Sequence, residues 1–407
     1  MAVNSTLIQD YIAKQSKEVC AFIYDLDFLS SHMQTLVAQL PTQVDSYYAI
    51  KANSDEAVLA ALLPHVYGFE VASMGEIAKV RAVSRDVPIA FGGPGKTISE
   101  LQTALDLNVE LFHLESELQL ARLNHLAAER GMRVKCLLRV NPHFDLPTAT
   151  LQMAGQATQF GIDEMELMAL LPRLSDYPHL EVIGFHFHCL SNNLDAYKHA
   201  ALVRHYVQTA QQWATQFKLN LTTINVGGGI GVTYQPHEQE FDFARYCELL
   251  AQLCRDYPHL RLATECGRYI SAECGVYLCE VTDIKQNHGQ YFAVLRGGSH
   301  HFRLPSSWQH NHPFVVIARD IWPYSFARPA AVKVAVTLCG ELCTPKDVLA
   351  KQVTVASLRA DDIVMFQKAG AYGWHISHHD FLSHPHPERV YIKDQTLLIS
   401  EDNHVTR

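Results

Sequence analysis

The sequence of 407 residues contains no run of eighteen consecutive apolar residues, which excludes a membrane-spanning helix. It also lacks any cluster of lysine and arginine that would offset its net charge of −9, from 33 basic and 42 acidic side chains. We therefore expect neither a nucleic acid nor an anionic membrane as a partner. No low-complexity stretch divides the chain, and 48% hydrophobic against 18% charged residues predicts a large folded core.

Two further absences concern the cellular compartment. The first residues lack the charged start and continuous apolar stretch of a secretory signal. The ten cysteines form no CxxC pair, and a chain of this length needs no disulfides to stabilise its core. We expect reduced thiols and a cytoplasmic location.

What the sequence does contain is a repeated alternation of a short β-like run, a small or polar turn and a helical stretch. The β-like runs are residues 46–50, 67–72, 88–91, 110–114, 134–140, 181–188, 222–226 and 261–265. Helical patterns lie between them at residues 56–63, 98–107, 115–129, 196–217 and 243–254. Eight such units predict a (β/α)8 barrel over residues 26–275 rather than an open sheet, which has about six strands.

After about residue 275 the pattern changes to short alternating runs with no long helix between them. These runs are residues 276–284, 291–295, 332–338, 363–366 and 389–392. They predict a mostly β C-terminal domain over residues 276–407. The β-like run at residues 19–24 leads us to include residues 1–25 in the same domain.

Residues with reactive or unusual side chains gather where the β-like runs end: Lys51, Arg139, His186, His188, Gly227–Gly229, Glu265 and Arg268. Active sites of barrels are built at this end of the strands, so we expect the site there. A desolvated lysine such as Lys51 can act as an amine nucleophile toward an aldehyde, although alone it fits an exposed strand end equally well. Glu265 could hold a proton on a ring nitrogen and Arg268 an anion, or the two could form an ordinary surface ion pair.

Metal binding is the main alternative for the histidines. His186 and His188 share one face of a strand, which suits buried core histidines, a metal pair or a ring stacked on a planar cofactor. Metal-dependent hydrolases of this architecture carry this pair on the first strand, with further ligands at later strand ends, and no such series follows here. Cys339 and Cys343, like the histidines of residues 378–386, lack the spacing of a zinc site. We expect no metal.

The glycines at residues 227–229 follow a strand closely, so backbone N–H groups could approach a phosphate there; a plain tight turn is the alternative. The segment is not a dinucleotide fingerprint, because Val232 stands where its last glycine would be. The turn that ends at Lys96 is not an ATP-binding loop, because Ala90 stands where its first glycine is required.

Several motifs together, in this order, resemble the alanine-racemase-fold, or type III, pyridoxal-phosphate decarboxylases, which include the diaminopimelate and ornithine decarboxylases. They are YAIKAN at residues 48–53, FEVASxGEI at 69–77, the HxH strand with Ser191 three residues after His188, GGG at 227–229, ECGR at 265–268, Cys343 followed by Asp347, and Gly370-Ala-Tyr372. The resemblance covers about residues 20–390. It implies a decarboxylase that requires pyridoxal 5′-phosphate.

The resemblance also implies the role of each matching residue. Lys51 forms a Schiff base with the cofactor, His188 stacks on its ring and Glu265 pairs with the pyridine nitrogen. The remaining cofactor-binding residues, most of them around the phosphate, are Ser191, Gly228, Gly229, Arg268, Tyr372 and Arg139. Cys343 comes from the second subunit of a homodimer, and either it or Lys51 returns the proton. Alanine racemases place an arginine against the ring nitrogen, so a carboxylate favours decarboxylation.

One position at which the sequence departs from the family pattern indicates the substrate. Thr344 stands where diaminopimelate and ornithine decarboxylases have an acidic residue that faces a distal ammonium. Residues 296–305, 185–195 and 370–388 instead resemble decarboxylases of carboxylate siderophore pathways, which act on citryl-diaminopropionate or citryl-serine. We expect citryl-diaminopropionate, in a substrate site formed by Arg303, His300, His301, Thr344 and Asp347.

Three alternatives remain beside this expectation. The first is a decarboxylase of diaminopimelate or another basic amino acid, and the second is a racemase. The third is a non-catalytic cofactor-binding homologue, which would be expected to lose Lys51 or Cys343, and both are present.

Overall fold

The computed structural model describes residues 3–144, 151–152 and 154–400, and in it the chain divides into two compact units. The barrel unit comprises His32–Val232 and Gln239–Ile270. The β unit comprises Met1–Ser31, Thr233–Glu238 and Ser271–Arg407. In this division the short segment Thr233–Glu238, which interrupts the barrel sequence, goes with the β unit.

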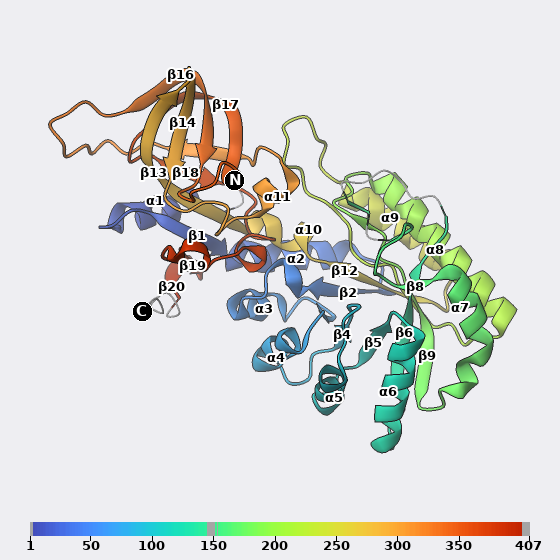
Figure 1. The fold of residues 1–407 in the computed structure, drawn as a ribbon. Helices are drawn as coiled ribbons and strands as arrows, with labels where there is room; N and C mark the ends of the chain where they lie inside the picture. Colours follow the sequence, from blue (N-terminus) through green and yellow to red (C-terminus); the bar gives the residue numbers. More distant parts are fainter. Residues whose placement is uncertain (1–2, 145–150, 153, 401–407) are drawn as a thin grey trace. The chain divides into compact units, whose positions relative to one another are not determined.

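Among the described residues of the barrel unit, eight parallel strands close on themselves in the order β2-β3-β4-β5-β6-β9-β11-β12, and β12 pairs with β2 (Figure 1). They are β2 (Val44–Ala49), β3 (Gly68–Val71), β4 (Ile89–Phe91), β5 (Leu111–Leu114), β6 (Val134–Asn141), β9 (Leu180–His186), β11 (Thr223–Asn225) and β12 (Arg261–Cys266). Short strands β7 (Leu151–Gln152), β8 (Ile162–Asp163) and β10 (Leu190–Ser191) lie in the connections. The predicted (β/α)8 barrel is confirmed.

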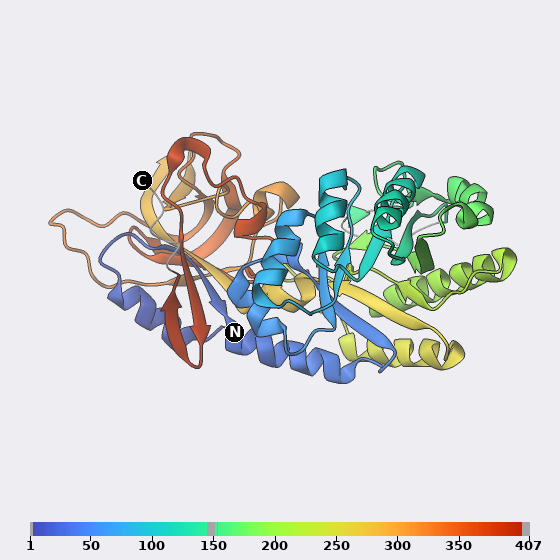
Figure 2. The same ribbon diagram turned by 90° about the horizontal axis from the view of Figure 1, so that it is seen from below.

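Helices lie around the outside of the barrel strands (Figures 1 and 2). They are α2 (Leu26–Gln39), α3 (Glu56–Leu62), α4 (Met74–Val83), α5 (Ile98–Asp106), α6 (Glu117–Glu129), α7 (Glu164–Leu170), α8 (Ala196–Phe217) and α9 (Phe243–Asp256), with the 3-10 turns η1 (Ile50–Ala52) and η2 (Leu171–Asp176). The five predicted helices are confirmed. Helix α4 gives a weak pattern because only Ile77 and Val80 of its residues are buried. No helix of the described residues combines the length and hydropathy of a membrane span.

The interior of the barrel is packed in layers. An apolar cluster of Tyr47, Ala90, Leu111, Leu137 and Ala263 comes from five different strands and is almost fully buried. Side chains two residues apart on a strand point to the same face. The residues two positions after each member of this cluster therefore form the next inward layer, on the C-terminal side. Its members are Ala49, Gly92, His113, Arg139 and Glu265. The layer that holds the polar residues therefore rests on an apolar floor.

The β unit contains a sheet in the order β17-β16-β14-β13-β1-β19-β20, with β18 paired to β13 and β15 paired to β18. Its strands are β1 (Cys20–Asp25), β13 (Gly275–Asn287), β14 (Gln290–Leu295), β15 (Phe314–Ile317), β16 (Ala330–Cys339), β17 (Val348–Arg359), β18 (Ile363–Phe366), β19 (Glu388–Lys393) and β20 (Thr396–Ile399). Its helices are α1 (Ser5–Lys14) and α11 (Leu304–Trp308), with η3 (Ala272–Cys274), η4 (Trp374–Ile376) and η5 (Phe381–Ser383). Helix α10 (Arg268–Ser271) lies in the barrel unit except for its last residue. The mostly β character of this region is confirmed, and β1 lies between β13 and β19.

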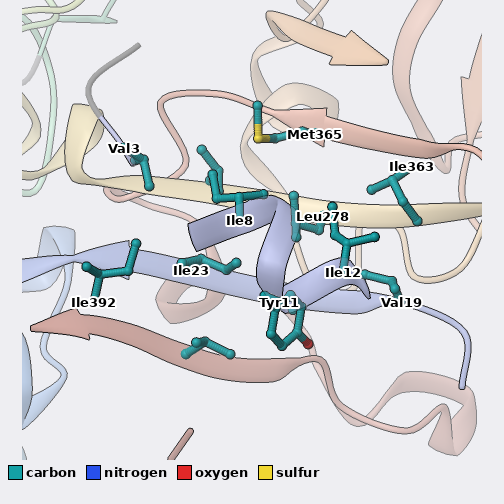
Figure 3. Packing of buried hydrophobic residues seen from close by; sticks show 13 residues of the cluster. Val3, Ile8, Tyr11, Ile12, Val19, Ile23, Leu278, Ile363, Met365 and Ile392 are labelled. Carbon is teal, nitrogen blue, oxygen red and sulfur yellow. The ribbon is translucent and has the colours of Figure 1, made fainter. Parts of the chain in front are cut away.

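The N-terminal helix supplies part of the core of the β unit. Ile8, Tyr11 and Ile12 of α1 pack against side chains of β1, β13, β18 and β19 in one buried cluster (Figure 3). Leu278 of β13 has no exposed surface and belongs to this cluster. Removal of such a side chain leaves a cavity whose walls cannot close completely, so its cost exceeds the transfer free energy of the missing atoms.

We expect Leu278→Ala to lower the free energy of unfolding by about 2–5 kcal/mol, because it opens a cavity in this cluster. Urea titration followed by near-ultraviolet circular dichroism measures the loss. Leu398→Ala in β20 is the matched control, since this leucine is 46% exposed, and its cost should stay within about 0.5 kcal/mol. Equal losses for the two variants would contradict the packing described for the cluster.

Candidate active site

Lys51 lies just beyond β2, in the turn η1, and its ammonium is paired with a buried acid. Its Nζ is 2.9 Å from Oε2 of Glu70, on the neighbouring strand β3. The side chain of Lys51 is 39% exposed whereas that of Glu70 is 6% exposed. Burial raises the pKa of Glu70, against the effect of the Lys51 charge. The pair holds the amine in one place and leaves it accessible from the C-terminal end of the barrel.

Glu265, at the end of β12, is a carboxylate with almost no exposed surface. Its Oε1 accepts a 2.7 Å hydrogen bond from Nδ2 of Asn225. Nδ1 of His113 lies 3.3 Å from Oε1, and Nε2 of His186 lies 3.2 Å from Oε2. Burial lowers the pKa of both histidines well below its usual value. The contacts recorded for this carboxylate among the described residues are therefore with neutral side chains, and it can serve as an acceptor for an N–H of a buried ring.

These residue types would also suit a metal ion. The ligand atoms of His113, His186 and Glu265 lie within 4.8 Å of one another. This grouping includes His186 of the HxH motif but not His188, so the two histidines of that motif face different surroundings. The sequence disfavours a metal here, and a ring nitrogen is the alternative partner for the same carboxylate.

His188 lies beside the glycine turn that follows β11. Its Nδ1 accepts a 3.1 Å hydrogen bond from the backbone N–H of Gly228, and burial lowers the pKa of its imidazole well below the usual value. A Cβ on Gly228 would lie 2.2 Å from the carbonyl oxygen of Glu265. Gly229 has a φ of +95°, and a Cβ there would lie 2.6 Å from the carbonyl oxygen of Leu190. Only glycine lets this turn come so close to two strand ends, as a backbone cradle for a phosphate requires.

Ser191, Arg268 and Arg139 lie on other elements of the barrel unit. Ser191 belongs to β10, and two residues later the N–H of Asn193 donates to the carbonyl of Gly229 at 2.8 Å. Arg268 begins α10 directly after β12 and is 7% exposed. Nη1 of Arg139 donates to Oε1 of Glu115 at 2.7 Å, and both side chains are buried. Contact of Arg139 with a cofactor stays a prediction.

Together, the residues of the barrel unit fit pyridoxal 5′-phosphate. They offer an accessible amine, a buried carboxylate acceptor, a neutral imidazole and a glycine turn in which any Cβ at Gly228 would collide with backbone. Each of these groups matches one part of the cofactor: aldehyde, ring nitrogen, ring face and phosphate.

The other predicted residues lie in the β unit. Cys343 is an exposed thiol in the loop between β16 and β17, and Thr344 beside it is half-buried. Asp347 closes this loop: its Oδ1 accepts a 2.6 Å hydrogen bond from the N–H of Ser299 and its Oδ2 a 2.9 Å bond from the N–H of Leu342. These bonds brace the Cys343 loop against the turn after β14. Substrate contact by Thr344 and Asp347 stays a prediction.

The predicted substrate-binding histidines differ from the predicted arginine in exposure. His300 and His301 have no exposed surface, and Nε2 of His300 lies 3.6 Å from Oε1 of Glu341. Arg303 is exposed, and no carboxylate of the described residues lies within salt-bridge distance of its guanidinium. Tyr372 has a φ of +53° and is half-buried. Of these residues, Arg303 is therefore the one most available to bind an anion.

The sequence analysis assigned no role to Glu70, His113 or Asn225. Glu70 and His113 are polar residues in strands of four otherwise apolar residues, GFEV and LFHL, and Asn225 ends the short strand TIN. That position was the available signal, because a buried polar side chain in a barrel strand needs a partner. The sequence could not name those partners, which come from other strands.

Comparisons with known proteins agree with this site. Residues 26–272, more than half of the chain, match the family model described as pyridoxal-dependent decarboxylase, pyridoxal binding domain. A Staphylococcus aureus protein named 2-[(L-alanin-3-ylcarbamoyl)methyl]-2-hydroxybutanedioate decarboxylase is 45% identical over 385 residues, 94% of this chain and 96% of that protein. The diaminopimelate decarboxylase of Campylobacter jejuni is 31% identical, over 89% of this chain and 88% of that one.

Solved structures confirm the fold. The crystal structure of Helicobacter pylori diaminopimelate decarboxylase complexed with L-lysine has a TM-score of 0.84 to this chain, at 24% identity, and the match covers 96% of this chain and 95% of the other.

We expect Gly228→Ala to abolish cofactor binding and to lower the free energy of unfolding by about 1–3 kcal/mol or more, because the new Cβ would overlap the backbone at Glu265. Thermal unfolding and titration with pyridoxal 5′-phosphate measure the two effects. Gly95→Ala is the matched control, since a Cβ at Gly95 meets nothing within 4 Å. A Gly228→Ala protein that binds the cofactor as the wild type does would rule out this turn as the phosphate cradle.

Proposed function

The chain belongs to the family of pyridoxal-dependent decarboxylases, and from this premise we propose that it removes the α-carboxylate of citryl-diaminopropionate in the biosynthesis of a carboxylate siderophore. The observation that carries the proposal is the 45% identity to the Staphylococcus aureus decarboxylase. The name of that enzyme describes a substrate in which a hydroxybutanedioate is joined, through an acetamide link, to C3 of alanine. That compound is citrate in amide linkage with 2,3-diaminopropionate.

The residues of the barrel unit support this chemistry. When bound, pyridoxal 5′-phosphate supplies an electron sink for the pair that remains when a carboxylate leaves as carbon dioxide. Lys51 would hold the cofactor through its amine, and the glycine turn with Ser191 and Arg268 would hold its phosphate. Glu265 would accept the ring N–H and so keep that proton in place. His188 would cover the ring as a neutral imidazole.

Decarboxylation is favoured over racemisation by the acceptor at the ring nitrogen. A carboxylate stabilises a protonated ring, and the protonated ring is the stronger electron sink. The direct neighbours of Glu265 are neutral, so its negative charge is not cancelled by a contacting cation. A racemase with an arginine at this place would have the opposite preference.

The distal end of the substrate is proposed to interact with Arg303. Its guanidinium is exposed and has no acidic partner among the described residues, so it can donate hydrogen bonds to a carboxylate of the citryl group. A charge-assisted hydrogen bond of this kind is worth about 1.5–3 kcal/mol, or roughly ten- to a hundredfold in specificity. His300 and His301 are fully buried, so we assign them to the support of the loop rather than to direct contact. Diaminopimelate remains the second candidate, because a diaminopimelate decarboxylase is 31% identical.

The active form is proposed to be a homodimer in which Cys343 of one subunit acts in the site of the other. The exposure of the Cys343 thiol supports this, since a proton donor must reach the reacting carbon. The other cysteines differ: eight of the ten are buried and all ten are free thiols. Free thiols also support the proposed reducing, cytoplasmic location.

The substrate proposal predicts rapid carbon dioxide release from citryl-diaminopropionate and slow release from diaminopimelate, measured by mass analysis of product and gas, with Lys51→Ala as the inactive control. Arg303→Ala should lower kcat/KM for the citryl compound by about ten- to a hundredfold. The same variant should change kcat/KM for N3-acetyl-diaminopropionate, which keeps the amide but lacks the carboxylates, by less than about threefold. Faster turnover of diaminopimelate would remove the siderophore assignment and leave the decarboxylase assignment in place.

The shared site predicts complementation between inactive subunits. Cys343→Ala alone should lose about 10²–10⁴-fold in kcat if Cys343 is the proton donor. Mixing Lys51→Ala subunits with Cys343→Ala subunits should restore part of the activity, because one site of the mixed dimer then has both residues. Cys339→Ala mixed with Lys51→Ala serves as the control for subunit exchange. No gain over the Cys343→Ala protein, with exchange demonstrated, would contradict a shared site.

A further inference from the structure

We infer that Asn225 and His113 are positioning residues that orient the carboxylate of Glu265 toward the ring nitrogen of the cofactor and connect it to the glycine turn. The inference rests on the proposed contact between Glu265 and that nitrogen. Neither residue would touch the substrate; both act through Glu265.

The side-chain amide of Asn225 has a fixed direction. Its Oδ1 accepts a 2.9 Å hydrogen bond from the backbone N–H of Gly227, the first glycine of the turn. Its Nδ2 donates to Oε1 of Glu265 at 2.7 Å. The reversed amide would place an oxygen against the carboxylate and an NH₂ group against an N–H, so this direction alone satisfies both neighbours. Asn225 has no exposed surface and thus no water that could substitute.

The direction of Asn225 also determines which nitrogen of His113 has the proton. Nδ2 of Asn225, which can only donate, lies 3.4 Å from Nε2 of His113, so Nε2 must be the acceptor. Burial and the neighbouring His186 lower the pKa of His113, so the ring has one proton only. That proton is therefore on Nδ1, which lies 3.3 Å from Oε1 of Glu265.

Oε1 of Glu265 thus has two neutral neighbours: the side-chain amide of Asn225, which donates to it at 2.7 Å, and Nδ1 of His113, which lies 3.3 Å away without hydrogen-bond geometry. They stabilise the charged carboxylate without cancelling its charge and leave Oε2, on the side of His186, for a further donor. The other charged side chains of this region have partners of their own: Lys51 pairs with Glu70, and Arg139 pairs with Glu115. A barrel that needed only packing could use apolar residues at these positions, as it does one layer below.

The test compares the equilibrium binding of pyridoxal 5′-phosphate with that of its 1-deaza analogue, in which a C–H group replaces the ring nitrogen. The wild type should prefer the natural cofactor by at least about tenfold, the worth of one charge-assisted hydrogen bond. Asn225→Leu and His113→Leu should each reduce that preference to within about threefold. His113→Asn should keep most of it, because its amide N–H can stand where Nδ1–H stood.

His199→Leu is the matched control. Nδ1 of the buried His199 lies 3.2 Å from Nδ2 of Asn193, so this pair has the same chemistry but does not contact Glu265. Its loss should lower the melting temperature and leave the preference between the two cofactors unchanged. If one leucine variant does not fold, Asn225→Ala or His113→Ala replaces it.

Two negative results have different meanings. Leucine variants that retain the wild-type preference, even with weaker binding of both cofactors, would show that Asn225 and His113 serve packing only, and the inference would be wrong. A wild type that does not discriminate between the two cofactors would instead refute the contact between Glu265 and the ring nitrogen. In that case the proposed cofactor placement fails first, and the positioning role fails with it.

Discussion

The buried negative charge of Glu265 is the constraint around which the polar layer inside the barrel, on the C-terminal side of the apolar cluster, is arranged. Removing a carboxylate from water is costly unless donors replace its hydration. Asn225 supplies one at 2.7 Å, and His113 and His186 place ring nitrogens at 3.3 and 3.2 Å. A lysine or arginine in contact would satisfy the carboxylate more strongly but would also neutralise it. Neutral donors keep the charge available, which is what a carboxylate opposite a ring N–H requires.

The alternation of side chains along the strands produces this arrangement at little structural expense. Ala263 and Glu265 are two residues apart, as are Leu111 and His113, and Leu137 and Arg139, so each polar residue stands above an apolar one. Closure of the barrel then brings the polar positions of separate strands together. The glycine turn reaches the same place because a Cβ at Gly228 would collide with the carbonyl of Glu265. The proposed phosphate cradle and the proposed acceptor for the ring nitrogen therefore lie side by side, with the backbone of Gly228 close to that of Glu265.

The sequence was sufficient for features that depend on local pattern. All eight barrel strands were predicted, and the chemistry-bearing strand ends at Lys51, Glu265 and the glycines could be read from spacing. The role of His113 could not be predicted, because it depends on closure of the barrel: its neighbour Glu265 comes from a strand far away in the chain. Strand β17 was missed for a different reason, since Gln352 within it has a φ of +52° and the pairing with β16 shifts register nearby. Such irregularity breaks the alternation that signals a strand.

The predicted substrate-binding residues, whose contact with substrate stays a prediction, differ in how exposed they are. Three donors, His300, His301 and Arg303, were expected to bind the distal end, yet both histidines have no exposed surface, and His300 faces Glu341 inside the unit. Arg303 remains. An exposed arginine contributes less than about 1 kcal/mol to an ordinary surface ion pair because water screens it. The contribution of an arginine hydrogen bond reaches about 1.5–3 kcal/mol only where water is excluded from the contact. The proposed contact between Arg303 and a citrate-bearing substrate would therefore be selective only if the substrate itself covers Arg303, which a small distal ammonium or a bare side chain would not do.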